Sequence, residues 1–366
     1  MTDIFCPIIN GGLQINLKLG GTPMINNCCL RSDLRPMTEN YWNNSSFIPL
    51  RELNRKNIWD DGCWTCRGNE LAGLESLRTG MLKKFGRKSN LSGPQHLDLM
   101  FDISCNLACR TCGPHSSTFW QRHLIQNKIP FNAPPPESKV EEMIDILETL
   151  DLSNLEMVVF AGGETLMGTG YWKVAEAIQK MTSHAKEKIV LCFQTNGTQP
   201  VPDKYFELIE KYHLVKLHIS LDGMDKRFEY LRWPAKWDQV KENIFNLANT
   251  LPTNCMFLVE ETISIFNLFY LHELKNWLNN NFSKNRLGDT VNHTHHVAHG
   301  LYSINYITKE YYDNLSEHKE LIPNNWSENH QSIRDMIAEI KKYDELRGQS
   351  FEKTFPEVAS FYSRYL

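Results

Sequence analysis

Three closely spaced cysteines, Cys105, Cys109 and Cys112 in the run CNLACRTC, are the residues whose types and spacing most directly indicate chemistry. Thiolates at the spacing CxxxCxxC can hold three irons of a [4Fe-4S] cube and leave the fourth iron without a protein ligand. A structural zinc site instead closes with four ligands, usually as two CxxC-type pairs. A three-cysteine loop with no fourth partner close by therefore predicts a cluster with one iron open to another ligand.

A second group of cysteines lies near the amino terminus: Cys6, the adjacent Cys28 and Cys29, and the CxxC of Cys63 and Cys66. Four thiolates from three separated segments make a closed set that fits either an auxiliary [4Fe-4S] cluster or a structural zinc ion. The sequence leaves the metal open. We take Cys6, Cys28, Cys63 and Cys66 as the ligands, with Cys28 slightly favoured over Cys29.

A glycine pair followed by a carboxylate, Gly162, Gly163 and Glu164, comes directly after a predicted strand. Glycines let the backbone approach a ligand closely, and the carboxylate can accept hydrogen bonds from an ammonium group. Alone, such a tripeptide is an ordinary turn. Its place at the end of a strand, one crossover after the cysteine loop, favours a ligand-binding role.

Polar residues also lie at the ends of the next two predicted strands: Thr195 and Asn196 at one, and Ser220 at the other, with Asp222 as a weaker candidate. The carboxyl ends of strands are where βα barrels keep their sites. Either segment taken singly is more often an ordinary turn. The repeated placement favours a shared site.

These side chains need a scaffold, and strand and helix patterns alternate along the chain from residue 96. Such alternation means a parallel sheet with right-handed crossovers, and six units are too few for an eight-stranded closure. We therefore predict an α/β fold with a partial (β/α)6 barrel. The expected strands are 96–103, 155–160, 188–193, 214–221, 255–262 and a weaker sixth near 301–307; the expected helices are 117–126, 139–150, 171–183, 202–212, 237–249 and 271–281.

The two ends of the chain lack the alternating strand and helix pattern of the barrel. The amino-terminal part is rich in loops, with a strand expected at 13–19 and helices at 47–54 and 71–85, the second because Leu71, Leu74 and Leu77 share a face. A further helix is expected at 332–346. We divide the chain into a cysteine-rich module (1–88), the barrel (89–310) and a carboxyl-terminal helical extension (311–366).

Composition excludes several classes of protein. The 39 Lys and Arg against 43 Asp and Glu give a formal charge of −4, so we expect no nucleic-acid partner and no binding to anionic membrane. No apolar run approaches the roughly 18 residues of a spanning helix, and the first residues lack a signal-peptide pattern. Clustered cysteines in a chain of 366 residues favour metal ligands over a disulfide scaffold. We expect a cytoplasmic protein.

The cysteine loop and the polar strand ends resemble the radical SAM superfamily, whose signature loop has this spacing and follows the first strand of a βα barrel. The resemblance implies an S-adenosylmethionine cofactor on the open iron, with Gly162, Gly163 and Glu164 binding its methionyl amine. It also implies that Thr195, Asn196 and Ser220 line its ribose and carboxylate. Thr165 stands where the family more often has Pro.

The amino-terminal cysteines, with the following Glu70 and Ser76, resemble the twitch module, a shortened relative of the SPASM domain of radical SAM proteins. This resemblance favours iron and sulfur over zinc. The module here precedes the barrel instead of following it, and its cysteines suffice for one auxiliary cluster.

By resemblance, the chain cleaves S-adenosylmethionine reductively to a 5′-deoxyadenosyl radical that abstracts hydrogen from a substrate. The expected outcome is peptide or protein modification, or oxidation, assisted by the auxiliary cluster; the alternative is oxidation or rearrangement of a sugar or other small molecule. A reducing partner such as flavodoxin or ferredoxin is implied.

Because the chain opens almost at once on Cys6, we expect no winged-helix module to bind a leader peptide. This lowers the expectation of a peptide substrate without excluding it, since a separate partner could bind the leader. A zinc-stabilised binding protein and a ferredoxin-like electron carrier are the competing classes.

Overall fold

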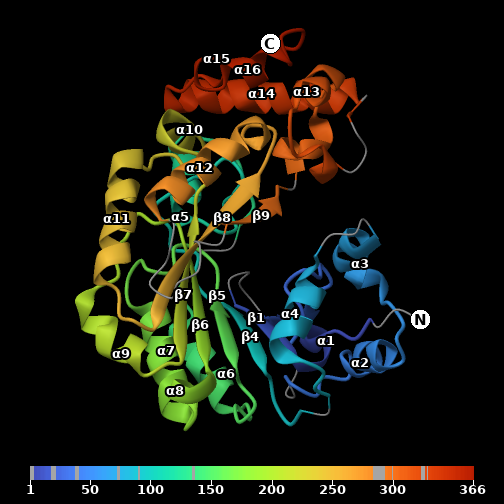
Figure 1. Cartoon of the computed structure of the whole chain (residues 1–366), viewed down its shortest axis with the longest axis vertical. Coiled ribbons are helices and arrows are strands. Elements are labelled where there is room, and N and C mark those ends of the chain that lie inside the picture. The colour runs from blue at the N-terminus through green and yellow to red at the C-terminus, as the bar shows by residue number, and fades with distance from the viewer. Residues whose placement is uncertain are drawn as a thin grey trace. The chain divides into compact units, whose positions relative to one another are not determined.

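The computed structural model describes residues 4–17, 22–37, 41–71, 75–89, 91–133, 137–282, 293–298, 300–322, 326–327 and 329–366 (Figure 1). The chain divides into two compact units that interleave along the sequence. Unit 1 comprises residues 1–104, 132–194 and 201–216, and unit 2 comprises residues 105–131, 195–200 and 217–366.

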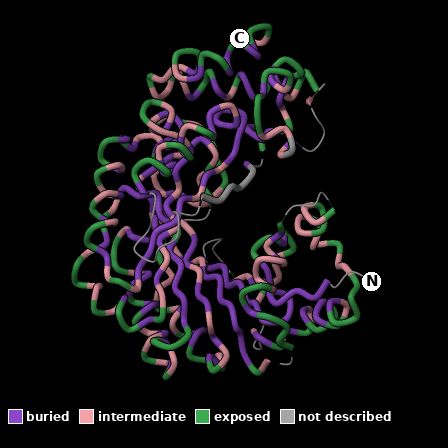
Figure 2. The backbone as a smooth tube through the Cα atoms, viewed as in Figure 1, coloured by how far each residue is buried: buried purple, intermediate pink, exposed green. Residues whose placement is uncertain are grey.

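Unit 1 is built on a sheet whose strands β1 (Gly12–Asn16), β4 (His96–Met100), β5 (Met157–Phe160) and β6 (Val190–Thr195) pair in parallel in that order. On the other side of β1, the short strands β2 (Met24–Asn26) and β3 (Arg35–Pro36) add antiparallel. The strands β1, β4 and β5 are almost wholly buried (Figure 2). Their residues are mostly apolar, and the polar ones, Gln14, Asn16, His96 and Asp98, are buried as well. The cysteine-rich segment thus extends the same sheet that carries β4.

Helices of unit 1 cover this sheet through aromatic contacts. Tyr171 and Trp172 of α7 (Gly170–Met181) contact Phe160 of β5 and Phe193 of β6, with ring centroids 5.7 and 4.6 Å apart. The other helices of unit 1 are α1 (Pro7–Gly11), α2 (Ile48–Arg55), α3 (Trp64–Leu71), α4 (Leu77–Phe85), α6 (Val140–Glu148), α8 (Ala185–Lys188) and α9 (Phe206–Glu210).

Unit 2 contains the end of β7 (Leu214–Ser220), followed in the sheet by β8 (Cys255–Ile263) and β9 (His293–Val297), which pairs with β8 in parallel. Its core joins the residues after β8 to the carboxyl-terminal helices, since Phe266 contacts the rings of Phe351 and Phe355. The helices of unit 2 are α5 (Thr118–Gln126), α10 (Asp225–Leu231), α11 (Trp237–Thr250), α12 (Leu271–Asn281), α13 (Lys309–Asn314), α14 (His330–Arg347), α15 (Phe351–Thr354) and α16 (Pro356–Ser360).

The α/β fold class is confirmed, and the six expected barrel strands correspond in number to β4 through β9. The position of the sixth was wrong. Residues 300–306 form short 3-10 turns, one of which begins where the Ser303 hydroxyl accepts the Asn305 amide. Their apolar residues Tyr302 and Ile304 pack in the core of unit 2. The sixth strand is β9, whose sequence HTHHV carries no alternation of apolar residues.

The single helix expected at 71–85 was also wrong. The helix α4 begins at Leu77, because the Ser76 hydroxyl accepts the Thr79 amide and the Thr79 hydroxyl accepts the Ser76 amide, which makes a capping box. Leu71 ends α3 instead, and Leu74 lies outside the described residues. The strand expected at 13–19 corresponds to β1, which ends at Asn16. Residues 18–19 lie outside the described ranges.

None of the helices within the described ranges is both long enough and apolar enough to cross a membrane.

Candidate active site

The cysteine loop follows β4 in the chain and is held in unit 2 by the first turn of α5. The Thr118 hydroxyl accepts the Cys105 amide at 3.2 Å and donates to the Cys105 carbonyl at 3.1 Å. The Trp120 indole donates to the Cys109 carbonyl at 3.0 Å. Both contacts fix the backbone of the loop and leave the thiols to other partners.

The three thiols of the loop are buried to different extents. Cys105 is buried, Cys109 is half-buried and Cys112 is exposed. Burial raises the pKa of the Cys109 thiol, and the charges of Cys112 and Cys105 act in the same direction. Because a metal ligand must be a thiolate, metal binding here releases protons that burial otherwise holds on sulfur.

The chemistry of the three cysteine donors is compatible with an iron–sulfur cluster. Within the described ranges, no three His, Cys, Asp or Glu side chains are grouped to hold a metal ion. Sulfur ligands of one tetrahedral ion lie about 3.8 Å apart, given bonds of about 2.3 Å. Ligands of a cube bind different irons, and three thiols on one loop are the donors that such clusters take.

The Thr-Asn-Gly segment predicted as part of the site meets the cysteine loop in unit 2. The Asn196 amide nitrogen lies 3.9 Å from the Cys105 sulfur and donates to the Asn106 side-chain oxygen at 2.9 Å. The Asn106 amide in turn donates to the Thr198 hydroxyl at 2.8 Å. The Thr195 hydroxyl accepts the Gly197 amide at 3.2 Å. The structure therefore brings Asn196 to Cys105, while Thr195 shapes its own turn.

The glycine pair lies in unit 1, against the residues that precede the cysteine loop. The Gly163 amide donates to the Asp102 carbonyl at 3.1 Å, and the Glu164 amide donates to the Ser104 carbonyl at 2.7 Å. A Cβ at Gly163 would lie 2.2 Å from the Ser104 carbonyl oxygen. Glycine is required here because the two backbones touch.

Glu164 and Thr165 complete this turn. The Glu164 carboxylate is buried and accepts the Leu166 amide at 3.0 Å. The Thr165 hydroxyl donates to the Gln194 carbonyl at 2.8 Å, which ties the turn to β6. Threonine thus supplies by a side-chain bond a rigidity that a proline ring supplies by restricting φ.

Ser220 is half-buried at the end of β7 in unit 2, and Asp222 follows it at the start of the next loop. Asp222 is already engaged, because it pairs with Arg232 at 2.8 Å and accepts the Thr262 amide at 2.8 Å. This pairing was not predicted from the sequence, because only the three-dimensional fold sets the two residues side by side.

The amino-terminal thiols gather around Cys28 in unit 1. Burial raises the pKa of Cys63 to about 11 and also raises the pKa values of Cys6 and Cys66, and the charge of Cys28 acts in the same direction on all three. Cys28 is buried, whereas Cys29 is exposed. The grouping supports Cys28 as the shared member of the set.

Glu70 and Ser76, noted in the sequence beside the CxxC, orient an arginine. Arg78 lies 2.5 Å from the Glu70 carboxylate and donates to the Phe5 carbonyl at 2.9 Å, next to Cys6. The Ser76 hydroxyl donates to Glu70 at 2.6 Å. This network connects the segment after the CxxC to the segment that carries Cys6.

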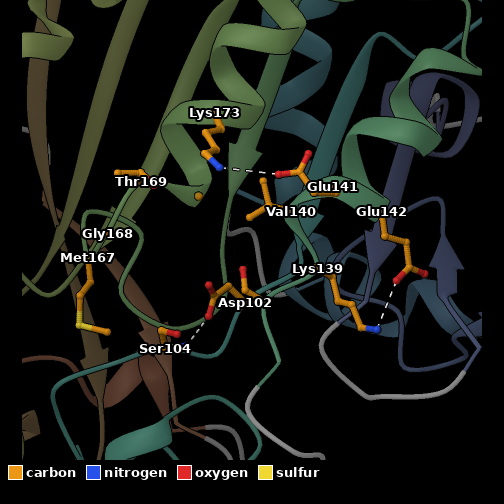
Figure 3. Close-up of a pocket in the computed structure, with 12 residues that line it drawn as sticks. Asp102, Ser104, Lys139, Val140, Glu141, Glu142, Met167, Gly168, Thr169 and Lys173 are labelled. Carbon is orange, nitrogen blue, oxygen red and sulfur yellow. Dashed lines mark hydrogen bonds and ion pairs between the residues drawn. The ribbon is translucent and has the colours of Figure 1, made fainter.

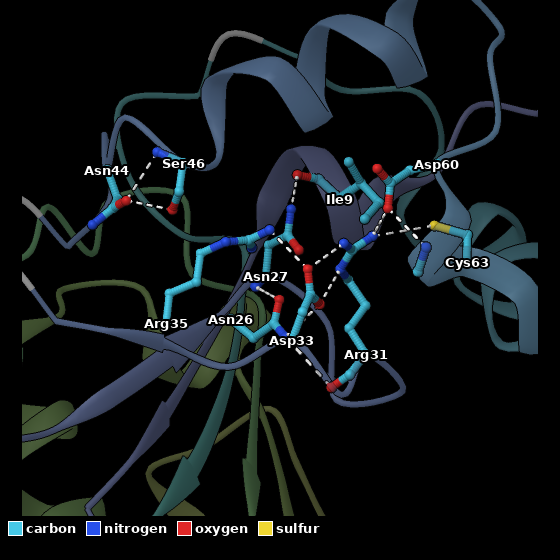
Figure 4. Close-up of polar contacts among 11 residues, drawn as sticks. Ile9, Asn26, Asn27, Arg31, Asp33, Arg35, Asn44, Ser46, Asp60 and Cys63 are labelled. Atoms are coloured by element: carbon cyan, nitrogen blue, oxygen red, sulfur yellow. Dashed lines mark hydrogen bonds and ion pairs between the residues drawn. The ribbon is translucent and has the colours of Figure 1, made fainter.

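A second arginine reaches a sulfur directly. The buried Arg31 guanidinium pairs with Asp33 at 2.6 Å and with Asp60, and its Nη1 lies 3.8 Å from the Cys63 sulfur (Figure 4). Asp60 also accepts the Gly62 amide at 2.9 Å, which fixes the approach to the CxxC. The thiol set is therefore enclosed by charged groups that are themselves paired.

Residues 103–266 match the radical SAM superfamily. No curated protein matches the chain. Among solved structures, native anSMEcpe with bound AdoMet is 15% identical with a TM-score of 0.40, covering 69% of this chain and 62% of that chain. Streptococcus suis SuiB bound to S-adenosylmethionine is 15% identical with a TM-score of 0.37, and the match covers 94% of this chain and 74% of that chain. SuiB bound to the precursor peptide SuiA is 14% identical with a TM-score of 0.37, and the match covers 97% of this chain and 75% of that chain. The chain thus spans less than two thirds of the length of anSMEcpe.

Proposed function

Residues 103–266 belong to the radical SAM superfamily, which uses a [4Fe-4S] cluster and S-adenosylmethionine, and on that premise we propose that the chain is a radical SAM enzyme. When bound, these groups supply an electron to the sulfonium and a 5′-deoxyadenosyl radical that takes hydrogen from a substrate carbon. The observation that carries the proposal is the gathering of three thiols on one loop, with Asn196 against Cys105.

Each residue then has a separate task. Cys105, Cys109 and Cys112 hold the cluster by their sulfurs. Gly162, Gly163 and Glu164 bind the methionyl amine, and their turn holds the carbonyl of Ser104, the residue before Cys105. Thr195, Asn196 and Ser220 line the ribose and carboxylate. The division of labour is supported by the placement of these residues at the ends of strands.

We further propose that Cys6, Cys28, Cys63 and Cys66 hold a second [4Fe-4S] cluster in an auxiliary module of residues 1–88. The grouping of their thiols around Cys28 supports it. A cluster closed by four cysteines has no iron open to substrate, so this module serves electron transfer. Residues 89–310 form the catalytic barrel, and residues 311–366 form a helical extension.

The proposed reaction is modification or oxidation of a peptide or protein in the cytoplasm, with electrons supplied by a flavodoxin or a ferredoxin. The twitch-like spacing of the amino-terminal cysteines supports a peptide substrate, because many radical SAM proteins with such modules modify peptides. The solved SuiB structure with its precursor peptide is in keeping with it.

A small molecule is the second candidate substrate, because unit 1 has a pocket of suitable size. The pocket has a volume of about 670 Å³ and borders Asp102 and Ser104, whose carbonyls the glycine turn holds (Figure 3). Small-molecule sites span about 300 to 1,000 Å³. Four of its charged residues are paired, Lys173 with Glu141 at 3.7 Å and Lys139 with Glu142 at 3.5 Å, and the Asp102 carboxylate accepts the Ser104 amide at 2.6 Å. The lining therefore favours a polar, uncharged or zwitterionic ligand such as a sugar or an amino acid.

The experiment that tests the proposal is anaerobic reconstitution with iron and sulfide, followed by incubation with S-adenosylmethionine and dithionite. We expect formation of 5′-deoxyadenosine, and its loss when Cys105, Cys109 or Cys112 is replaced by serine. Intact S-adenosylmethionine together with stoichiometric bound zinc would instead support a zinc-stabilised binding protein.

A further inference from the structure

Two backbone hydrogen bonds connect the cysteine loop, in the antiparallel sense, to the last residue of α10 and the segment that follows it. The Ala108 amide donates to the Trp233 carbonyl and the Arg110 amide donates to the Leu231 carbonyl, both at 2.7 Å. In an antiparallel pair, the two residues between successive hydrogen-bonded pairs face each other, with Cα atoms about 4.5 Å apart and side chains close.

The residues that lie between these two hydrogen bonds are Cys109 on one segment and Arg232 on the other. The two side chains interact electrostatically. The charge of Arg232 lowers the pKa of Cys109, while the larger effect of burial raises it. The charges of Cys109 and Cys112 also act on Arg232. The hydrogen bonds on both sides of Cys109 and Arg232 place the arginine opposite this cysteine, and the electrostatic interactions between the two side chains agree with that placement.

Arg232 is held in place by a buried partner. Its side chain is 9% exposed, and it pairs at 2.8 Å with Asp222, whose side chain is 2% exposed. The Thr262 amide fixes the other Asp222 oxygen at 2.8 Å, and the Asn267 amide donates to the Asp222 carbonyl at 3.2 Å. An arginine remains charged in such a site. Because the pair is buried, its field at the sulfurs is little screened by salt.

We propose that Arg232 is the counter-charge of the cysteine loop and raises the reduction potential of the cluster that the loop holds. The inference rests on the proposed function. Reduction adds one electron to a centre that three thiolates already make negative, and a nearby positive charge stabilises the reduced form. Net charge and solvent exposure around a cluster set its potential. Arg232 acts through the cluster and is a positioning residue, while Asp222 sets where its charge lies.

The test is an EPR-monitored redox titration of the reconstituted protein and of Arg232→Gln, Arg232→Lys and Asp222→Asn. We expect Arg232→Gln to lower the reduced-to-oxidised ratio about tenfold at a fixed potential, a shift of about 59 mV for one electron. Arg232→Lys keeps the charge and should stay near the wild type, and Asp222→Asn should shift the potential upward. To separate the two iron–sulfur centres, all variants are made in a background in which Cys63 and Cys66 are serine.

Arg227→Gln is the matched control, because Arg227 lies on α10, the helix directly before Arg232, and pairs with Glu273. Its potential should equal that of the wild type. Unchanged potentials in all three variants that bind iron would overturn the inference. If Arg232→Gln binds no cluster, an upward shift in Asp222→Asn still supports the inference, and its absence contradicts it. A wild type that assembles no EPR-active cluster contradicts the proposed function itself, which is a separate outcome.

Discussion

Arg110, in the middle of the cysteine loop, forms a buried ion pair with Asp344 of α14. The guanidinium nitrogen lies 2.5 Å from the carboxylate, and the arginine side chain is fully buried. The second oxygen of Asp344 accepts the Phe351 amide at 2.5 Å, so the same carboxylate also holds the start of α15. The loop is thus anchored by a residue 234 positions further along the chain.

Removing Asp344 should destabilise the protein strongly. Asp344→Ala leaves the buried Arg110 charge without its partner, and breaking a buried pair costs about 3 to 5 kcal/mol. Denaturant unfolding measures the loss. Glu339→Gln on the same helix is the control, since Glu339 pairs with the half-exposed Lys342, and such pairs contribute about 0 to 1 kcal/mol. Equal effects of the two substitutions would contradict the anchoring role.

Gly163→Ala should distort the contact between the glycine turn and Ser104, the residue before the cysteine loop. The new methyl group would meet the Ser104 carbonyl at 2.2 Å, and overpacking of this kind costs about 1 to 3 kcal/mol. We expect a lower free energy of unfolding together with weaker binding of S-adenosylmethionine, measured by calorimetry. Gly113→Ala, beside Cys112, meets nothing within 4 Å and should change neither quantity. A neutral Gly163→Ala would contradict the close approach.

His96 should make the protein less stable in mild acid. Burial, aided by the charge of Lys84, lowers its pKa from 6.5 to about 4. Between pH 6.5 and 4 the unfolded chain therefore takes up a proton that the folded chain does not. Stability from this residue is full above pH 6.5 and falls by about 3 kcal/mol as the pH drops to 4.

The measurement is the pH dependence of the unfolding free energy for the wild type and for His96→Phe, which retains a ring near Phe85. The difference between the two curves isolates His96, because the other titrating groups are common to both proteins. Parallel curves from pH 4 to 7 would show that His96 is not held neutral.

Cys63→Ser should distinguish the role of the amino-terminal cysteines from that of the cysteine loop. We expect the variant to lose about half of its iron and to retain cleavage of S-adenosylmethionine in the absence of substrate. Cys105→Ser should abolish cleavage and retain the other half of the iron. Iron analysis and 5′-deoxyadenosine formation provide the two readouts. Identical behaviour of both variants would refute separate roles.

The sequence predicted what depends on neighbouring residues and missed what depends on distant ones. The cysteine spacing and the strands from β4 to β8 are local patterns, and the prediction of the α/β fold from them is confirmed. The sixth strand was misplaced because Tyr302 and Ile304 mimic strand alternation while packing in the core of unit 2. The pairs Arg110–Asp344 and Asp222–Arg232 were not predicted, because only the folded chain brings their members together.

The assigned site residues themselves stay predictions. Asn196 lies against Cys105, and its contact with the ribose and carboxylate of the cofactor stays a prediction, as do the ligand contacts of Glu164, Thr195 and Ser220. Glu70 and Ser76 proved to orient Arg78, which a spacing pattern does not indicate.

The central claim is that the cluster on Cys105, Cys109 and Cys112 leaves one iron open to S-adenosylmethionine. The most direct measurement is the EPR spectrum of the reduced protein with Cys63 and Cys66 replaced by serine, recorded before and after the cofactor is added. We predict a single [4Fe-4S] signal whose g values shift on addition, because the cofactor binds the open iron. A signal that the cofactor leaves unchanged would contradict the claim.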